Sequence, residues 1–161
     1  MNIFYLHPDP LKAAEMHCDK HCVKMILETA QMLCTAHRVL DGDEQADKYG
    51  MYKTAHLNHP TTQWVRGSML QYEWTYHLFK FLCDEYRYRY KKVHMTDKKM
   101  RGLLRKPPYF MSERPTYTQP PQCMPDEYKV PGDAVKAYRN YYKGEKAQFA
   151  KWQYSKTPDW W

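Results

Sequence analysis

The sequence lacks the features of a secreted or membrane-spanning protein. Its five cysteines, at positions 18, 22, 34, 83 and 123, have no disulfide-framework spacing. We find no secretory signal pattern, and the longest apolar runs are far too short to cross a bilayer. We therefore expect a cytosolic location, no membrane partner, and reduced cysteines that pack as small buried residues.

Signatures of metal sites and of sequence-specific nucleic-acid binding are also absent. His17 and His21, like Cys18 and Cys22, have the i, i+4 spacing that two metal ligands on one helix need, but paired Cys-x-x-Cys and His-x-x-Glu-His motifs do not occur. We therefore expect no metal and no other cofactor. There is no zinc finger, RRM core or helix-turn-helix signature, so nothing supports base-specific readout.

The chain does carry an excess of positive charge and many aromatic rings. Lys and Arg number 25 against 18 Asp and Glu, and 15 of the 161 residues are tyrosines. A basic chain favours polyanionic partners, and tyrosine suits both a protein core and stacking on nucleobases. The length is typical of a single compact domain that buries roughly two-thirds of its unfolded surface.

Helix signals recur along the chain, so the sequence predicts an all-α fold of three main helices with long irregular connections. Asp9 is a predicted N-cap with Pro10 at the first helical position, and Asp133 is the predicted cap of the last helix. The expected order is an apolar strand or plug at 3–6, a helix from 10 to about 40, a polar connection at 41–58, a helix from about 58 to 90, a basic stretch at 91–106, a Pro- and Tyr-rich loop at 107–132, and a helix from 134 to about 152.

One face of the first predicted helix carries the most informative chemistry. Spacings of 4, 3, 4, 3 and 7 place six polar side chains on that face: His17, His21, Lys24, Glu28, Gln31 and Arg38. Apolar residues flank Glu28, although Lys24 and Glu28 also have the i, i+4 spacing of an ordinary solvated ion pair. A partly desolvated glutamate can act as a general acid or base, or stabilise a cationic sugar-like transition state.

Two basic segments contain interleaved aromatic residues, the combination that holds phosphates and stacks bases. One runs from 86 to 106 and the other from 138 to 146. They favour contact with DNA or RNA over a merely solubilising role.

The segment Cys18-Asp19-Lys20-His21, followed by Glu28 seven residues after the histidine, resembles the first helix of the phage pyrimidine-dimer DNA glycosylases (endonuclease V). In that family an Asp-Gln-His triplet precedes, at the same distance, the glutamate essential for catalysis. Similar features follow in the same order: Asn58-His59-Pro60, the helix through Tyr86-Arg87, and the Tyr138–Lys143 cluster. The resemblance implies a small, basic, all-α enzyme whose Tyr-rich C-terminal segment contacts DNA. The whole sequence is also similar to an uncharacterised set of phage-encoded proteins, which implies the cytoplasm of an infected bacterial host.

The resemblance has one departure. The family attacks the sugar carbon with the α-amine of an N-terminal threonine, whereas this chain begins Met1-Asn2. Three alternatives follow: Lys20 or Lys24 forms a Schiff base in its place; Glu28 and an activated water release the base without strand cleavage; or the scaffold modifies a flipped pyrimidine.

We therefore expect an enzyme that acts on a pyrimidine base, or its N-glycosidic bond, in duplex DNA with the base flipped out. Alternatives are a transferase that hypermodifies thymine or hydroxymethyluracil in phage DNA, and a non-enzymatic DNA-binding or host-interaction protein. Glu28, His21 and Lys24 are the candidate catalytic residues, and Trp64 or Tyr90 is expected to stack on the base. The candidate DNA-binding residues are His17, Gln31, Arg38, Arg87, Arg89, Lys91, Lys92, Lys98, Lys99, Arg101, Arg139, Tyr142 and Lys143.

Overall fold

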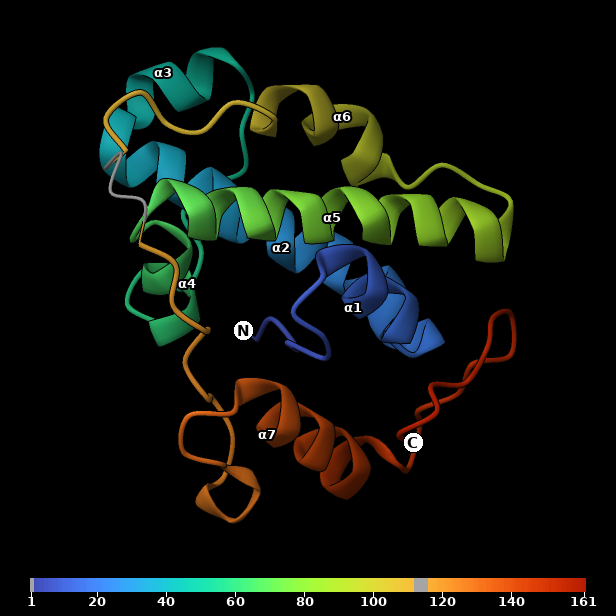
Figure 1. The fold of residues 1–161 in the computed structure, drawn as a ribbon. Helices are drawn as coiled ribbons and strands as arrows, with labels where there is room; N and C mark the ends of the chain where they lie inside the picture. Colours follow the sequence, from blue (N-terminus) through green and yellow to red (C-terminus); the bar gives the residue numbers. More distant parts are fainter. Residues whose placement is uncertain (1, 112–115) are drawn as a thin grey trace.

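Two long helices, α2 (Asp19–Asp41) and α5 (Met69–Tyr90), lie side by side through the middle of the computed structural model (Figure 1). The structure describes residues 2–111 and 116–161. Met25 and Leu33 of α2 and Leu78 and Phe79 of α5 are completely buried. Each such side chain contributes roughly 1.5–3 kcal/mol of burial free energy, so this contact is the centre of the core.

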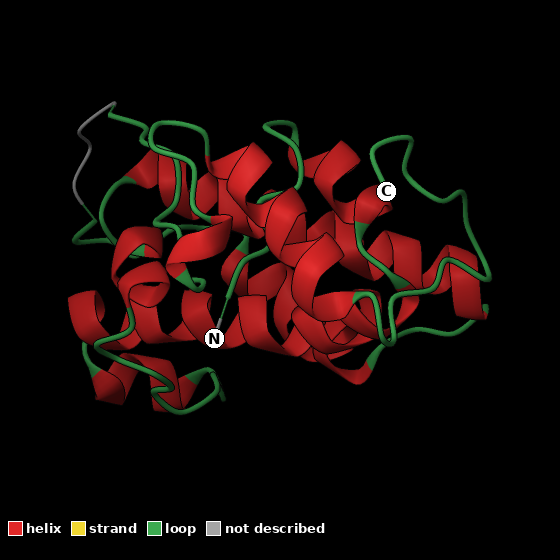
Figure 2. Cartoon of the chain, turned by 90° about the horizontal axis from the view of Figure 1, so that it is seen from below, coloured by secondary structure: helices red, strands yellow, loops and turns green. Residues whose placement is uncertain are grey.

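Shorter helices surround this pair, and the all-α expectation is confirmed. They are α1 (Pro10–Met16), α3 (Asp43–Lys48), α4 (Pro60–Val65), α6 (Met95–Leu104) and α7 (Ala134–Tyr141), with a 3₁₀ turn at Asp126–Tyr128 and a π-helical segment at Tyr142–Lys146. The part of the chain that the structure describes contains helices and loops and no strand (Figure 2). Within that same part, no helix has the length and apolar character that a bilayer crossing requires.

The expectation of three main helices is wrong, because each expected helix is interrupted at a definite residue. The helix expected over 10–40 breaks at His17 and Cys18, whose backbone is extended. The helix expected over 58–90 breaks before Ser68, whose Oγ accepts the Gln71 N–H and starts α5. The helix expected over 134–152 leaves α-helical geometry after Tyr141. Helices α3 and α6 form within segments expected to be irregular.

The N-terminal segment is the expected plug and forms no strand. Residues 3–6 are buried, and in Figure 1 the segment lies between α1 and α7. Asn2 donates its side-chain amide to the Cys123 carbonyl, and Arg139 of α7 donates to the Leu6 carbonyl. Phe4 has a φ of 47°, a left-handed conformation that is strained for an aromatic residue. The plug therefore ties the start of the chain to its last helix.

The expected caps are confirmed. Asp9 accepts the Leu11 N–H with Pro10 at the first helical position, and Asp133 accepts the Lys136 N–H at the start of α7. Of the expected 107–132 loop, residues 112–115 lie outside the described residues. The remainder is irregular apart from the 3₁₀ turn.

Arg89 holds the break between α1 and α2 against α5. Its guanidinium is fully buried and donates to the carbonyls of Glu15 and His17, which a continuous helix would have used itself. It also forms ion pairs with Glu85 at 2.8 Å and Asp19 at 3.2 Å. The carbonyls of Glu15 and His17, which the break leaves without helical partners, therefore both accept a hydrogen bond from Arg89.

Arg89→Ala is expected to lower the free energy of unfolding by about 3 kcal/mol, because it removes a buried cation and leaves its carboxylate and carbonyl partners unpaired. The matched control is Arg87→Ala, whose side chain is 59% exposed and 3.7 Å from Asp97; its effect is expected to lie within about 0.5 kcal/mol. Urea denaturation measures both. An equal decrease of the free energy of unfolding in both variants would contradict the structural role of Arg89.

Candidate active site

A cavity of about 290 Å³ lies where the N-terminal plug, α2 and the π-helical segment meet. Its lining residues come from five parts of the chain and are Asn2, Phe4, Lys24, Glu28, His59, Cys123, Tyr141 and Lys146. Two of the three candidate catalytic residues, Lys24 and Glu28, are therefore together in one cavity.

Glu28 is the carboxylate of this cavity. Only 17% of its side chain is exposed, and its Oε1 is 3.2 Å from Nζ of Lys24, one turn earlier on α2. The Lys24 side chain is 62% exposed, so the pair links the cavity to the surface. A carboxylate with limited hydration and a cation beside it can activate a water or stabilise positive charge that develops on a bound sugar.

Lys146 and Tyr141 face Glu28 from the other side of the cavity, on the last turns of the α7 region. Nζ of Lys146 donates to the Tyr141 hydroxyl at 3.3 Å and lies 4.6 Å from the centre of the Tyr141 ring. The same amine lies 5.9 Å from the Phe4 ring. Five residues apart on an α-helix, the two side chains would diverge, whereas the wider π-helical turn, with its i→i+5 bonds, brings them together.

His21 lies beneath the cavity and does not line it. Its ring stacks on Phe4 with centroids 4.3 Å apart, and its Nδ1 is 2.7 Å from the Tyr142 hydroxyl. Burial, with smaller contributions from nearby His17 and Lys146, lowers the His21 pKa to about 3. A neutral, packed imidazole supports the Phe4 ring that forms part of the cavity wall, so its proposed role changes from catalysis to positioning.

Five other candidate residues are buried and have internal partners, which removes them from any DNA surface. His17 bonds to the Ala13 carbonyl, Tyr142 to His21, and Trp64 to Thr118. Arg38 donates to Asp43, Asp47 and two carbonyls of the segment after α3, and Arg89 bridges α1, α2 and α5. Each of these two guanidinium groups uses most of its five N–H donors inside the protein, and burial keeps phosphate away from the rest.

Two further candidate cations have partners within the protein but are less buried. Arg101 pairs with Asp84 and Asp97, while Arg139 donates to the Leu6 carbonyl and lies 5.3 Å from the Trp160 ring. Tyr90 is half-buried between the rings of Tyr86 and Tyr154.

The remaining candidate residues divide between two sides of the molecule. Lys143 is exposed on the π-helical segment, and Gln31 is half-buried one turn beyond Glu28. Lys91, Lys92, Lys98 and Lys99 are exposed around the end of α5 and on α6, with Arg87 nearby. In Figure 1 the α2–α5 pair separates α6 from α7, so the two basic segments do not form one clamp around Glu28.

Several cavity residues were missed by the sequence analysis. Asn2 and Phe4 are brought to Glu28 by the plug, and Cys123 arrives through the bond between its carbonyl and Asn2. Tyr141 and Lys146 lie in the basic segment expected at 138–146. The sequence has no signal that these two side chains, and not Tyr142 and Lys143, face the cavity. Among residues 2–111 and 116–161, no three His, Cys, Asp or Glu side chains converge as a metal site requires.

Comparison with known protein families finds a match over the first part of the chain. The family described as pyrimidine dimer DNA glycosylase matches residues 1–99. This span contains Lys24, Glu28 and His59 of the cavity and ends before Cys123, Tyr141 and Lys146. No curated protein and no solved structure matches the chain.

The buried histidines give the fold a pH signature. Burial lowers the pKa of His21 to about 3 and that of His17 to about 4, from ordinary values of 6.5. Their contribution to stability is therefore complete above about pH 6.5, and it is lost as pH falls toward 3 because the unfolded chain takes up these protons first.

We expect the free energy of unfolding to decrease as pH falls from 6.5, and the decrease to be shallower in His21→Asn. Urea denaturation across pH measures both slopes. NMR of the His21 ring is expected to show no titration between pH 8 and about 5; a midpoint near 6.5 would contradict the buried neutral imidazole.

Proposed function

The chain belongs to the pyrimidine dimer DNA glycosylase family, and from this we propose that it cleaves the N-glycosidic bond of a pyrimidine in DNA, with the Glu28 cavity as its active site. One observation carries the proposal: Glu28, inside the family-matched span, is a largely desolvated carboxylate in a cavity with cations on two sides. A glycosylase needs such a group because bond cleavage places positive charge on the sugar.

In the proposed reaction Glu28 accepts a proton from a water molecule as the water oxygen bonds to C1′ of the deoxyribose. The C1′–N bond breaks, and its electron pair leaves with the base, which then takes up a proton. The products are a free base and an abasic site. The same carboxylate stabilises the cationic sugar in the transition state, a contribution that is stronger in a partly dehydrated cavity.

Lys24 and Lys146 supply the positive charge of the proposed site. Their positions on either side of Glu28 suit the two phosphates that flank a flipped nucleotide. The Tyr141 and Phe4 rings take the stacking role first expected of Trp64 or Tyr90, and they offset part of the few kcal/mol that base extrusion costs.

A lysine Schiff base is the alternative route to a nucleophile. Lys24 lines the cavity, whereas Lys20 is exposed with its Nζ 4.5 Å from the Phe149 ring and does not. The α-amine of Met1 lies outside the described residues. The water route is the one proposed, because the amine of Lys24 is held in an ion pair with Glu28.

Glu28→Gln is expected to reduce base release by roughly 10²- to 10⁴-fold while DNA affinity is retained, because the amide can neither accept the proton nor stabilise the cationic sugar. The assay uses duplex oligonucleotides with a thymine dimer, thymine, uracil or hydroxymethyluracil, and mass spectrometry detects the abasic product. Glu44→Gln, on exposed α3, is the matched control and should retain activity. Unchanged mass of all substrates with the native protein would contradict the glycosylase and favour a donor-dependent transferase or a binding protein.

Charge reversal around the cavity tests the DNA path. Lys20 and Lys143 are exposed beside it, and the double variant Lys20→Glu/Lys143→Glu is expected to lower kcat/KM on duplex substrate and to reduce its salt slope by roughly 2, one for each phosphate contact. Lys98→Glu/Lys99→Glu makes the same charge change on α6 and should leave the slope of duplex turnover unaltered. Equal loss in both variants would argue that duplex DNA follows another path.

A further inference from the structure

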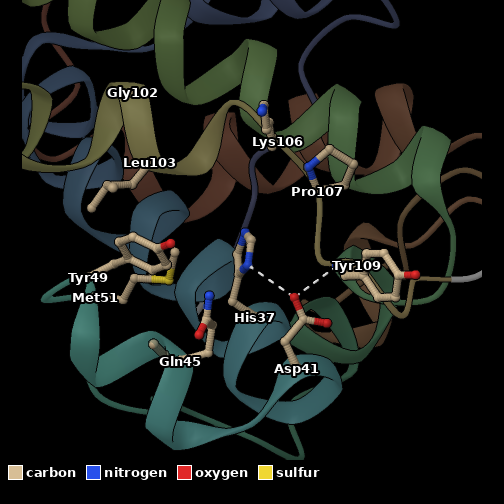
Figure 3. Close-up of a pocket in the computed structure, with 11 residues that line it drawn as sticks. His37, Asp41, Gln45, Tyr49, Met51, Gly102, Leu103, Lys106, Pro107 and Tyr109 are labelled. Atoms are coloured by element: carbon tan, nitrogen blue, oxygen red, sulfur yellow. Dashed lines mark hydrogen bonds and ion pairs between the residues drawn. The ribbon is translucent and has the colours of Figure 1, made fainter.

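A second and larger cavity, of about 470 Å³, lies at the other end of α2 (Figure 3). It is enclosed by the last turn of α2, by α3, by the end of α6 and by the chain after α6. Its lining includes Tyr49, Met51, Leu103, Pro107 and Tyr109, so most of the wall is apolar or aromatic. None of these residues takes part in the Glu28 site.

Two neighbouring aromatic residues are presented to solvent at the edge of this cavity. Tyr109 is 86% exposed and Phe110 is 69% exposed, and their rings meet edge to face at 4.9 Å. The Asp41 carboxylate holds their backbone by accepting the N–H groups of both residues, at 2.8 and 3.0 Å. Exposed rings on a backbone fixed in this way form a stacking platform that loses little entropy when a ligand binds.

Two neighbouring polar groups of the cavity, His37 and Asp41, offer acceptor atoms. The Tyr72 hydroxyl donates to the Leu104 carbonyl, so Nε2 of His37 carries the proton that it shares with Tyr72 at 2.9 Å. Burial lowers the pKa of His37, against the opposing effects of the Asp41 carboxylate and the Lys106 backbone. In the neutral ring with its proton on Nε2, Nδ1 is an acceptor, 3.9 Å from Asp41. A ligand with N–H donors on the edge of a planar ring matches these acceptors, and nucleobases have such an edge.

Cations line the approach to the cavity. Lys106 is part of its wall, and Lys98 and Lys99 are exposed on α6 one turn before Gly102 and Leu103, which line it. Arg105 is exposed at the end of α6 and lines a neighbouring pocket against α5. For these four side chains the described residues provide no carboxylate partner within ion-pair distance. They are therefore available to phosphates, in contrast to Arg101 of the same helix, which is paired with two aspartates.

This face is remote from the Glu28 cavity. In Figure 1 the α2–α5 pair lies between α6 and the α7 region, and a single helix layer is about 10 Å thick. A straight duplex seated at Glu28 therefore does not reach the outer face of α6. The phosphates that α6 attracts therefore lie on the opposite side of the α2–α5 pair from those at Glu28.

We propose that the face formed by α6, Tyr109, Phe110 and the His37–Asp41 cavity binds single-stranded DNA. Phosphates lie along the α6 cations, one base enters the cavity toward the His37 and Asp41 acceptors, and the next stacks on Tyr109 or Phe110. A paired duplex does not fit this chemistry, because its base faces and Watson–Crick edges are already occupied. The proposal concerns a site distinct from the glycosylase centre.

The test measures fluorescence anisotropy of a short fluorescein-labelled oligothymidylate titrated with the full chain. Tyr109→Ala/Phe110→Ala is expected to weaken binding at least about tenfold, since base stacking on aromatic side chains makes a large contribution to single-strand affinity. Tyr88→Ala, which removes a 62% exposed tyrosine at the far end of α5, is the matched control and should have no effect. Thymidine monophosphate is expected to compete only weakly, which distinguishes a strand site from a free-nucleotide site.

Each failure has its own signature. Glu28→Gln is expected to bind the single strand with native affinity, so absence of glycosylase activity leaves this test intact. Single-strand affinity that is unchanged in Tyr109→Ala/Phe110→Ala, or that is lost equally in Tyr88→Ala, would overturn the proposal. The proposal would also be overturned if Lys20→Glu/Lys143→Glu lowered single-strand affinity while Lys98→Glu/Lys99→Glu did not. That result would place the strand on the Glu28 side of the molecule.

Discussion

The buried guanidinium of Arg89 is the interaction on which the arrangement of this protein depends. Its N–H groups donate to the carbonyls of Glu15 and His17 at the end of α1. Helix α1 can therefore end and α2 begin with only two residues between them. The new start fixes the rotation of α2 about its axis, since Asp19 at its first position pairs with the same guanidinium and also accepts the Gln153 N–H. That rotation directs Lys24 and Glu28 toward the plug.

The cavity around Glu28 is assembled by contacts between the two ends of the chain. Asn2 reaches Cys123, Leu6 accepts from Arg139, and His21 bonds to Tyr142. The π-helical turn then places Lys146 beside Tyr141, the last residue of α7, in the cavity. The family match ends at residue 99, so the matched span supplies the carboxylate while the segment beyond it supplies the opposite wall.

Local rules predicted the features that depend on neighbouring residues. The caps at Asp9 and Asp133 and the shared face of Lys24 and Glu28 follow from spacing alone, and the structure has all three. The polar stripe failed over distance: from His17 to Arg38 it would extend roughly 30 Å at 1.5 Å per residue, longer than one site. Its first member precedes α2 and its last is enclosed by the segment around α3.

Whether a cation is buried could not be predicted from its type. Arg87 and Arg89 are two residues apart on one helix, yet one is exposed and the other is sealed inside. The difference arises from what α5 packs against, a tertiary fact that no local pattern contains. The same holds for the neighbouring Tyr141 and Tyr142, of which the first lines the Glu28 cavity and the second is fully buried.

The plug also affects the order in which the parts of the protein can fold during synthesis. Its partners, Cys123 and Arg139, are separated from it by more than a hundred residues, so on the ribosome the first segment emerges long before anything exists to cover it. Helices α2 and α5 can pack together earlier, but the cavity at Glu28 forms only after the last third of the chain has left the ribosome. A nascent or prematurely terminated chain thus carries Glu28 without the residues that form the opposite wall of its cavity.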